Sequence, residues 1–513
     1  MGINELLEKF YYTLQTEKKI VLSEASDLYE CTKKCTMEDR KKYADGIASK
    51  IGYNIIVDIF MWSFVLYIYP DKQYMISLEQ LILDDKELNW RQINYLYNQI
   101  SCMIFMNPSL KSTDTISLNW KISEKVNKMC KEELSVSLDK IPMEERNQNL
   151  VIVLTDQYLT IQHGPTKTTL DRCYVLKKIF KKNVFLINSG ETLTQVGQVP
   201  FFKTMVGNYN EDLLDTDTVS WKGESFSFYQ CDYIMPEVEE LTNLINAVKK
   251  LKPCMVVSVG GTDVLSGLIN EMIPVVTVGL TQSGLVTTLT DYQVVEQRMT
   301  KEVIPILEKM GKDISHIIEG RFTFSLKPQT EHLIRADVGL EEDNFVISVV
   351  GGRLTDEITD EFLEMLEHIT EKYSNVKIAI IGVCEDIDKK IKKHPKVGEN
   401  IEYLGFCKDI LSRLELCDLY VNPIRTGGGT SAVEAMFMGK PPITVNYGDV
   451  AGIVGQDFIC DSYNEMEKII EKYITDKEFY DMKSKNAKEL SKELLDSENE
   501  FVRIINEYLK RAN

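Results

Sequence analysis

The stretch NPIRTGGGTSAVEAMFMGKPP, residues 422–442, places three consecutive glycines between an apolar segment and a run of small residues with helical spacing. The segment DLYVNP, residues 418–423, has the composition of a buried β-strand. Glycine lets a phosphate approach the backbone closely, and the free N–H groups at a helix N-terminus favour an anion. We therefore predict a strand, a phosphate-binding turn and a helix that begins near Thr430 or Ser431.

The predicted turn contains four candidate residues for a diphosphate: Gly427, Gly428, Gly429 and Thr430. Glu434 lies about one helical turn further on, where its carboxylate can accept hydrogen bonds from ribose hydroxyls. The glycines have an alternative interpretation, because they also permit tight packing of a strand against a helix. If they cradle a phosphate, Gly428→Val abolishes donor binding without unfolding the domain. If they serve packing, the same change lowers stability first.

Strands and helices alternate in two blocks, which begin near residues 150 and 345. Apolar strands such as LVIVLTDQYL (150–159) and FVISVVGGRL (345–354) are each followed by a segment with helical periodicity. This order predicts two doubly wound α/β domains. A long, mainly helical segment is expected between the blocks, and mixed three- and four-residue spacings predict a mainly helical region before residue 146.

The predicted organisation has four parts. They are a helical extension (1–145) for acceptor or partner binding, an acceptor domain (146–325), a donor domain (326–490) and a C-terminal helix (491–513).

Composition narrows the class of protein and its compartment. The formal net charge of −19 disfavours nucleic acid as a partner, because phosphate backbones are bound by lysine and arginine. The 11 cysteines are scattered and odd in number, which is typical of reduced thiols in a cytoplasm. The N-terminus has no signal-peptide pattern, and the apolar run at residues 53–70 contains Asp58, so we expect a buried helix and no transmembrane segment.

The C-terminal block carries four motifs in a fixed order over roughly 170 residues. They are GGRL (351–354), IEYLGFCKDILSRLELCDLYVNP (401–423), TGGGTSAVEAMFMGKPPIT (426–444) and GDVAGIV (448–454). This block resembles the nucleotide-sugar-binding domain of the GT-B glycosyltransferases, particularly family 4. The resemblance implies a GT-B architecture of two Rossmann-like domains facing a cleft, with a nucleotide-diphosphate sugar in the C-terminal domain.

The resemblance also assigns roles to individual residues. It implies that Arg353 binds the donor diphosphate and assists catalysis, that the glycine turn with Thr426 is the phosphate turn, and that Glu434 binds ribose. Two positions depart from the family pattern. Thr426 stands where the family has a second glutamate, and Ile358 stands where a lysine is usual.

Three loops in the first block are candidates for the acceptor side. The loop TDQYLTIQHGPTKTTLDR (155–172) contains His163, which can bond a sugar hydroxyl or take the acceptor proton, or serve a purely structural role. Lys167 and Arg172 either supply positive charge or are ordinary solvated helix residues. The predicted acceptor or cleft residues are Gly164, Lys167, Gly261 in VGGTDVLSG (259–267) and Ser283 in TQSGLV (281–286). Asp263 is expected to cap a helix.

The resemblance implies a glycosyltransferase that moves a sugar, from a UDP-sugar in the first instance, to a glycan, lipid or protein with retention of configuration. A catalytically silent assembly partner and a nucleotide-sugar epimerase of the same architecture are the alternatives. No cofactor is expected beyond the nucleotide sugar as co-substrate. The triplet Asp215, Thr216, Asp217 is a weak metal motif in so acidic a chain, so we predict metal-independent chemistry.

Overall fold

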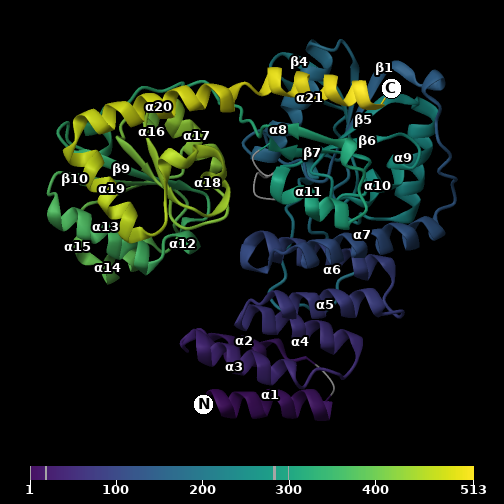
Figure 1. Ribbon diagram of the computed structural model, residues 1–513, viewed down its shortest axis with the longest axis horizontal. Helices are drawn as coiled ribbons and strands as arrows, with labels where there is room; N and C mark the ends of the chain where they lie inside the picture. The colour runs from purple at the N-terminus through teal and green to yellow at the C-terminus, as the bar shows by residue number, and fades with distance from the viewer. Residues whose placement is uncertain (1, 18–19, 281–284, 298–299, 513) are drawn as a thin grey trace. The chain divides into compact units, whose positions relative to one another are not determined.

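The computed structural model describes residues 2–17, 20–280, 285–297 and 300–512 (Figure 1). The chain divides into two compact units. Unit 1 comprises Met1–Leu280, Gly284–Glu319 and Ile504–Asn513, and unit 2 contains Gly320–Arg503.

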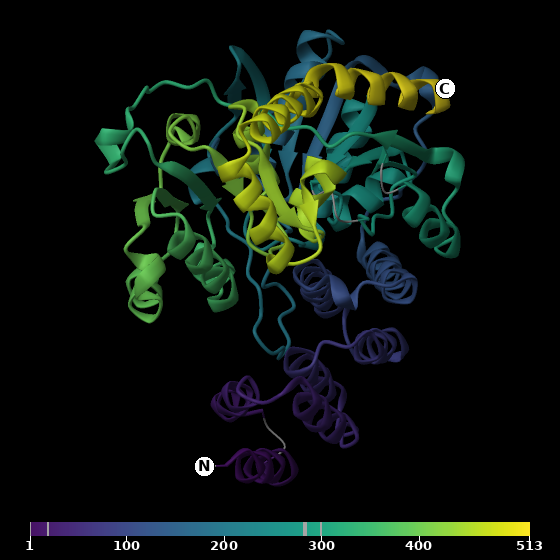
Figure 2. The same cartoon turned by 60° about the vertical axis from the view of Figure 1, so that its left-hand side comes forward.

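Unit 1 begins with a stack of helices, which confirms the predicted helical N-terminal region. Figure 1 shows these helices as a stack with α1 at one end and with α6 and α7 nearest the sheet, and Figure 2 shows the same stack from another side. They are α1 Ile3–Glu17, α2 Leu22–Thr32, α3 Met37–Ala48, α4 Ile55–Ile68, α5 Lys72–Asp84, α6 Trp90–Met106 and α7 Thr113–Glu133. Helix α7 contacts α10 (Val264–Asn270) and α11 (Thr300–Lys309) of the following domain, so the extension is part of unit 1.

The most apolar run of the chain forms α4, which is buried on nearly all sides. Its acid, Asp58, accepts the backbone N–H groups of Gly52 (3.0 Å) and Tyr53 (2.8 Å). These bonds compensate the carboxylate for lost hydration. The expectation of a buried helix is confirmed, and within the described residues no helix is long and apolar enough to cross a membrane.

A long loop between the second and third strands joins the helices to the sheet. Phe202 of this loop packs edge-on against Tyr29, Phe60, Phe64 and Tyr67 of α2 and α4. The backbone of Phe202 also donates a hydrogen bond to Ser63 (2.9 Å). Large buried aromatic surfaces stabilise such a contact strongly. The loop therefore fixes the helical region against the α/β domain.

Glu79 of α5 is completely buried, and neither of its carboxylate oxygens has a hydrogen-bond partner among the described residues. Burial raises the pKa of Glu79 well above its ordinary value. Because the pKa of Glu79 is higher in the folded state than in the unfolded state, protonation favours folding. This contribution to stability is fully present at pH values below the unfolded-state pKa and is lost as pH rises through the folded-state pKa. We expect Glu79→Gln to raise the free energy of unfolding by roughly 1–2 kcal/mol at pH 8 and to have almost no effect at pH 4.

Thermal melts at several pH values measure this difference, and the exposed Glu87 on the following turn gives a matched control, Glu87→Gln. A stabilisation by Glu79→Gln that does not change with pH would contradict the buried, titrating carboxyl.

Unit 1 contains an eight-stranded sheet in the order β3-β4-β2-β1-β5-β6-β7-β8. The strands from β4 to β7 pair in parallel, and β3 joins β4 antiparallel. The strands are β1 Asn147–Thr155, β2 Asn183–Asn188, β3 Thr218–Trp221, β4 Glu224–Gln230, β5 Pro253–Val259, β6 Val275–Val278, β7 Tyr292–Glu296 and β8 Ile317–Gly320. Helices α8 (Gly164–Lys178) and α9 (Val238–Leu251) belong to the crossovers between the parallel strands.

The expected helical segment between the two blocks is wrong in part. Strands β7 and β8 lie there and extend the first sheet, and α11 is a helix of 10 residues between them. Both strands are short, at five and four residues, so their period-two pattern is too brief to recognise in the sequence.

Unit 2 contains a six-stranded sheet in the order β11-β10-β9-β12-β13-β14, in which all neighbouring strands are parallel. The strands are β9 Phe345–Gly351, β10 Val376–Gly382, β11 Ile401–Gly405, β12 Leu419–Val421, β13 Pro442–Val445 and β14 Ile459–Cys460. The helices are α12 Leu354–Glu357, α13 Asp360–Lys372, α14 Ile387–Lys393, α15 Pro395–Gly398, α16 Ile410–Leu414, α17 Gly429–Phe437, α18 Gly448–Val454, α19 Tyr463–Thr475 and α20 Lys477–Leu495. The last helix, α21 (Ser497–Ala512), ends on unit 1, where Tyr508 donates to the carbonyl of Pro274.

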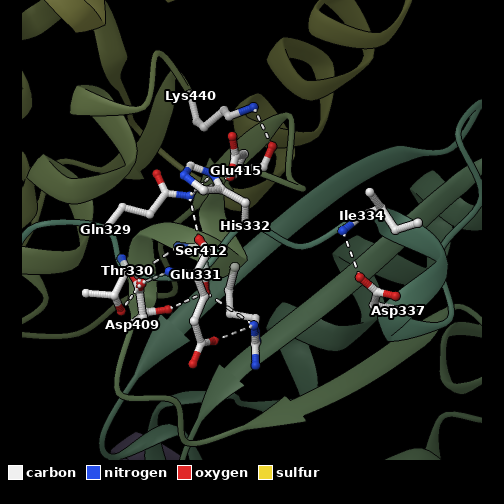
Figure 3. A network of polar contacts seen from close by, with 11 residues as sticks. Gln329, Thr330, Glu331, His332, Ile334, Asp337, Asp409, Ser412, Glu415 and Lys440 are labelled. Carbon is white, nitrogen blue, oxygen red and sulfur yellow. Dashed lines mark hydrogen bonds and ion pairs between the residues drawn. The ribbon is translucent and has the colours of Figure 1, made fainter.

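The segment that enters unit 2 is bound to the start of α16 (Figure 3). Oδ2 of Asp409 accepts hydrogen bonds from the backbone N–H groups of Thr330 (2.6 Å) and Glu331 (2.9 Å), and Oδ1 caps α16 at Ser412. Burial alone raises the pKa of Asp409, but these donors outweigh it and lower the pKa below its usual value. Glu415 holds the same segment through Gln329 and His332.

Candidate functional site

The point where strand order reverses in unit 2 lies between β9 and β12. The chain runs from β9 to β10 and β11 on one side of the sheet, and from β12 to β13 and β14 on the other. In parallel α/β sheets, ligands bind beyond the carboxyl ends of the strands at such a switch point. The two loops that leave these strands are the motifs GGR (351–353) and IRTGGG (424–429), so the fold places both at this position.

Two arginines from these loops share one carboxylate. Nη1 of Arg425 lies 2.8 Å from Oε2 of Glu357, and Nε of Arg353 lies 3.2 Å from Oε1. The side chain of Arg425 is 3% exposed and that of Arg353 is 55% exposed. One guanidinium is therefore buried beneath the loops, whereas the other reaches solvent.

The structure explains Gly428 by packing. Gly428 is the N-cap of α17. Its φ of +106° is rarely adopted by residues with a side chain. A Cβ atom at this position would lie 2.5 Å from Nη2 of Arg425, inside van der Waals contact. The expectation that Gly428→Val spares the fold is therefore wrong, because the substitution would strain the backbone and displace a buried arginine.

Gly427 differs from its neighbours. A Cβ atom on Gly427 would meet one side-chain atom, Nη2 of Arg353, at 2.9 Å, and its φ lies outside the positive region. At Gly429 a Cβ would instead press on the Phe324 ring at 3.2 Å, and at Gly352 it would meet nothing within 4 Å. Packing therefore does not explain why residues 352 and 427 are glycines. These two glycines form a surface without side chains beside the guanidinium of Arg353.

The other predicted donor residues lie on or next to α17, which begins at Gly429, within one residue of the predicted start. Thr430 is half-buried, and Thr426 is buried with its carbonyl accepting the N–H of Asp449 at 2.7 Å. Glu434 is 9% exposed, one turn into the helix. The backbone N–H groups of the first turn of α17 form the positive end of the helix dipole.

The two departures from the family 4 pattern have a structural counterpart. Ile358, at the place of the usual lysine, is buried in the core of unit 2. The acid Glu357 directly precedes Ile358, where the family has a lysine. The base Arg425 directly precedes Thr426, where the family has a glutamate. Glu357 and Arg425 form the buried ion pair. Sequence reasoning missed both residues, although an arginine directly before a glycine turn was a signal.

In unit 1, His163 is the residue before α8, and its Nδ1 lies 3.1 Å from Oγ1 of Thr166. Burial and the charge of Lys167 lower the pKa of His163 below its ordinary value. This shift favours the neutral imidazole, which can accept a proton. Gly164 opens α8, and Lys167 is half-buried on its first turn. Arg172 is 4% exposed, which corrects its interpretation as a solvated helix residue.

The loop after β5 contains Gly261, whose φ of +80° and close approach to Thr277 give it a structural role. Asp263 caps α10 through the N–H of Ser266 (2.7 Å), as predicted. Ser283 lies outside the described residues.

Two further carboxyls, missed in the sequence, accompany Asp263 at this end of the sheet. Asp156 directly follows β1 and accepts a hydrogen bond from Thr262 (2.6 Å), and Glu191 accepts the N–H of Val264 (2.9 Å). Burial raises the pKa of all three, with the neighbouring charge of Asp156 contributing to a value of about 6 for Asp263. No group of three or more His, Cys, Asp or Glu side chains in the described ranges is arranged to bind a metal, and metal independence stays a prediction.

Comparisons with known proteins give a family match for the C-terminal region. Residues 331–490 match the family model described as Glycosyl transferases group 1. No curated protein matches the chain. The solved structure of a Thermobaculum terrenum O-GlcNAc transferase mutant is similar over 99% of this chain and 97% of that chain, with 11% identity and a TM-score of 0.55.

Two other structures align over less of the chain. Anabaena HepE in complex with UDP covers 70% of this chain and 99% of its own, with 13% identity and a TM-score of 0.48. The structure of TarM covers 72% of this chain and 99% of its own, with 12% identity and a TM-score of 0.49. At such identities the likeness concerns the fold, and the first structure confirms the predicted GT-B fold class with its helical N-terminal region. The family match supports a glycosyl transfer function for the C-terminal region.

Proposed function

We propose that this chain is a glycosyltransferase that moves a sugar from a nucleotide-diphosphate donor, with a UDP-sugar as the first candidate, to a glycan, lipid or protein acceptor. The observation that carries the proposal is the side-chain-free surface of Gly352 and Gly427 beside Arg353 at the switch point of unit 2. Backbone without side chains and one half-exposed guanidinium are the features that a diphosphate requires.

The proposed chemistry breaks the bond between the anomeric carbon and the diphosphate oxygen and forms a bond between the same carbon and the acceptor oxygen. Negative charge then grows on the leaving diphosphate, and Arg353 with the N–H groups at the start of α17 stabilises it. No metal is assigned to this step. The incoming acceptor hydroxyl must lose its proton, and we propose neutral His163 as the group that bonds this hydroxyl or takes its proton. We propose retention of configuration on the basis of the resemblance to family 4.

Unit 1 is the proposed acceptor side, with Gly164 and Lys167 near His163, and the stack α1–α7 is proposed to bind the acceptor or a protein partner. All 11 cysteines are free thiols, which supports the proposal of a cytoplasmic protein. The acidic charge supports the proposal that nucleic acid is no partner.

One alternative has specific support. Thr426 and buried Ile358 replace two functional residues of the family pattern, which a catalytically silent assembly partner would tolerate. Such a protein would bind UDP without hydrolysing or transferring the donor.

A thermal-shift screen against nucleotides and nucleotide sugars tests the proposal, because a ligand that binds the native state raises its stability with occupancy. Product analysis with a stabilising UDP-sugar follows. Transfer or slow hydrolysis supports the proposal, binding alone supports the silent partner, and recovery of an epimerised nucleotide sugar would replace transfer by epimerisation.

Glu434→Ala is expected to weaken UDP binding by about one to two decades, because a hydrogen bond between a carboxylate and ribose hydroxyls contributes roughly 1.5–3 kcal/mol. Isothermal titration of UDP measures the loss, and a melt of the same sample shows whether unit 2 remains folded. An unchanged dissociation constant would remove Glu434 from the ribose site.

A further inference from the structure

We propose that Arg425 and Glu357 are positioning residues of the diphosphate site: buried Arg425 fixes Glu357, and Glu357 holds the guanidinium of Arg353 beside Gly427. This inference rests on the proposed function and extends it to residues that never touch the donor.

Arg425 is held from several directions at once. Its Nε donates to Asn422 (2.7 Å), its Nη2 donates to the carbonyl of Val350 (2.7 Å) and to the hydroxyl of Tyr420 (2.8 Å), and its Nη1 pairs with Glu357. These partners belong to β9, β12, the loop after β12 and α12. A planar guanidinium with fixed donors joins such elements in one geometry, which a lysine does not reproduce.

Glycines on both sides make room for this guanidinium. A Cβ atom on Gly351 would clash with Nη1, and one on Gly428 would lie 2.5 Å from Nη2. The buried cation thus lies between the two loops that form the candidate site. Because a buried charge must be paired, Glu357 is required in its place beside Arg425.

Glu357 connects the buried Arg425 to the exposed Arg353. Its side chain is 11% exposed, and each carboxylate oxygen contacts a different arginine. A half-exposed arginine loses conformational freedom when it binds a ligand, and an anchor at Nε lowers that cost while Nη2 remains directed at Gly427.

Charge alone predicts the opposite effect from positioning, which makes Glu357→Gln a sharp test. Two guanidiniums and one carboxylate carry a net charge of +1, and removing the carboxylate raises the positive charge near the donor. Simple attraction would therefore tighten UDP binding. Positioning predicts weaker binding, by about tenfold, since Arg353 loses its anchor.

The experiment is a double-mutant cycle on the full chain, with UDP affinity measured for wild type, Glu357→Gln, Arg353→Ala and the double variant. We expect Glu357→Gln to cost about tenfold when Arg353 is present and almost nothing in the Arg353→Ala background. Arg425→Lys, which retains the charge but not the planar donors, should show the same dependence on Arg353. Melting temperatures of all variants give the folded fraction to which each affinity is referred.

A loss of the same size in both backgrounds would overturn the inference, because it would indicate a general structural effect. Tighter UDP binding by Glu357→Gln would overturn it in favour of charge alone. If wild type binds none of UDP, GDP or ADP, the proposed function itself fails and the inference fails with it. If wild type binds one of these nucleotides but the cycle shows no coupling between Glu357 and Arg353, only the positioning inference fails and the proposed function stands.

Discussion

Arg353→Ala is expected to lower kcat by about 100-fold or more while raising the Kd for UDP by only about tenfold. The guanidinium is half-exposed, so its attraction to a ground-state diphosphate is screened by water. Charge on the diphosphate increases as the glycosidic bond breaks, and an interaction that strengthens in the transition state affects turnover more than binding. Donor hydrolysis or transfer under saturating UDP-sugar gives kcat, and titration gives Kd.

Arg321 offers a matched control in the same unit. It is also about half exposed and pairs with a surface carboxylate, Glu493, so Arg321→Ala removes the same charge from the protein without touching the switch point. Equal losses of turnover and affinity in Arg353→Ala would make Arg353 a binding residue only.

The elements around the site were predictable because their signals are local. The strand β12, the glycine turn and the start of α17 follow one another within a few residues, and each has a residue-level cause in apolar composition, glycine or helical spacing. Arg353, in contrast, was assigned by the resemblance to a known family, through the motif GGRL that directly follows β9.

What the sequence did not reveal depends on contacts between distant segments. Arg425 and Glu357 are 68 residues apart, and nothing in either segment indicates that they share a buried ion pair. The same holds for Phe202, which packs on α2 and α4 more than a hundred residues earlier in the chain. Loop glycines are ambiguous for a related reason: Gly428 and Gly427 are neighbours, but one accommodates the buried Arg425 and the other lies against the exposed guanidinium of Arg353.

That difference between neighbouring glycines gives the strongest expected effect on binding. Gly427→Val should raise the Kd for UDP by about 100-fold or more, while the melting temperature changes by no more than about 2 °C. The backbone of Gly427 has a φ that other residues adopt, and a new side chain meets the flexible end of Arg353 before any backbone atom. The branched side chain would fill the space proposed for the diphosphate and push Arg353 aside. Titration of UDP and a thermal melt on one sample separate the two quantities.

Gly428→Ala is the matched comparison, because it adds the smallest side chain one residue away. Here the φ of +106° and the guanidinium of Arg425 at 2.5 Å predict a loss of stability of roughly 1–3 kcal/mol, with binding reduced as a consequence of the distorted turn. The two variants should therefore differ in kind: Gly427→Val is folded and does not bind, whereas Gly428→Ala melts early. If Gly427→Val bound UDP as wild type does, the diphosphate would not lie against Gly427, and the surface of Gly352 and Gly427 beside Arg353 would lose its proposed role.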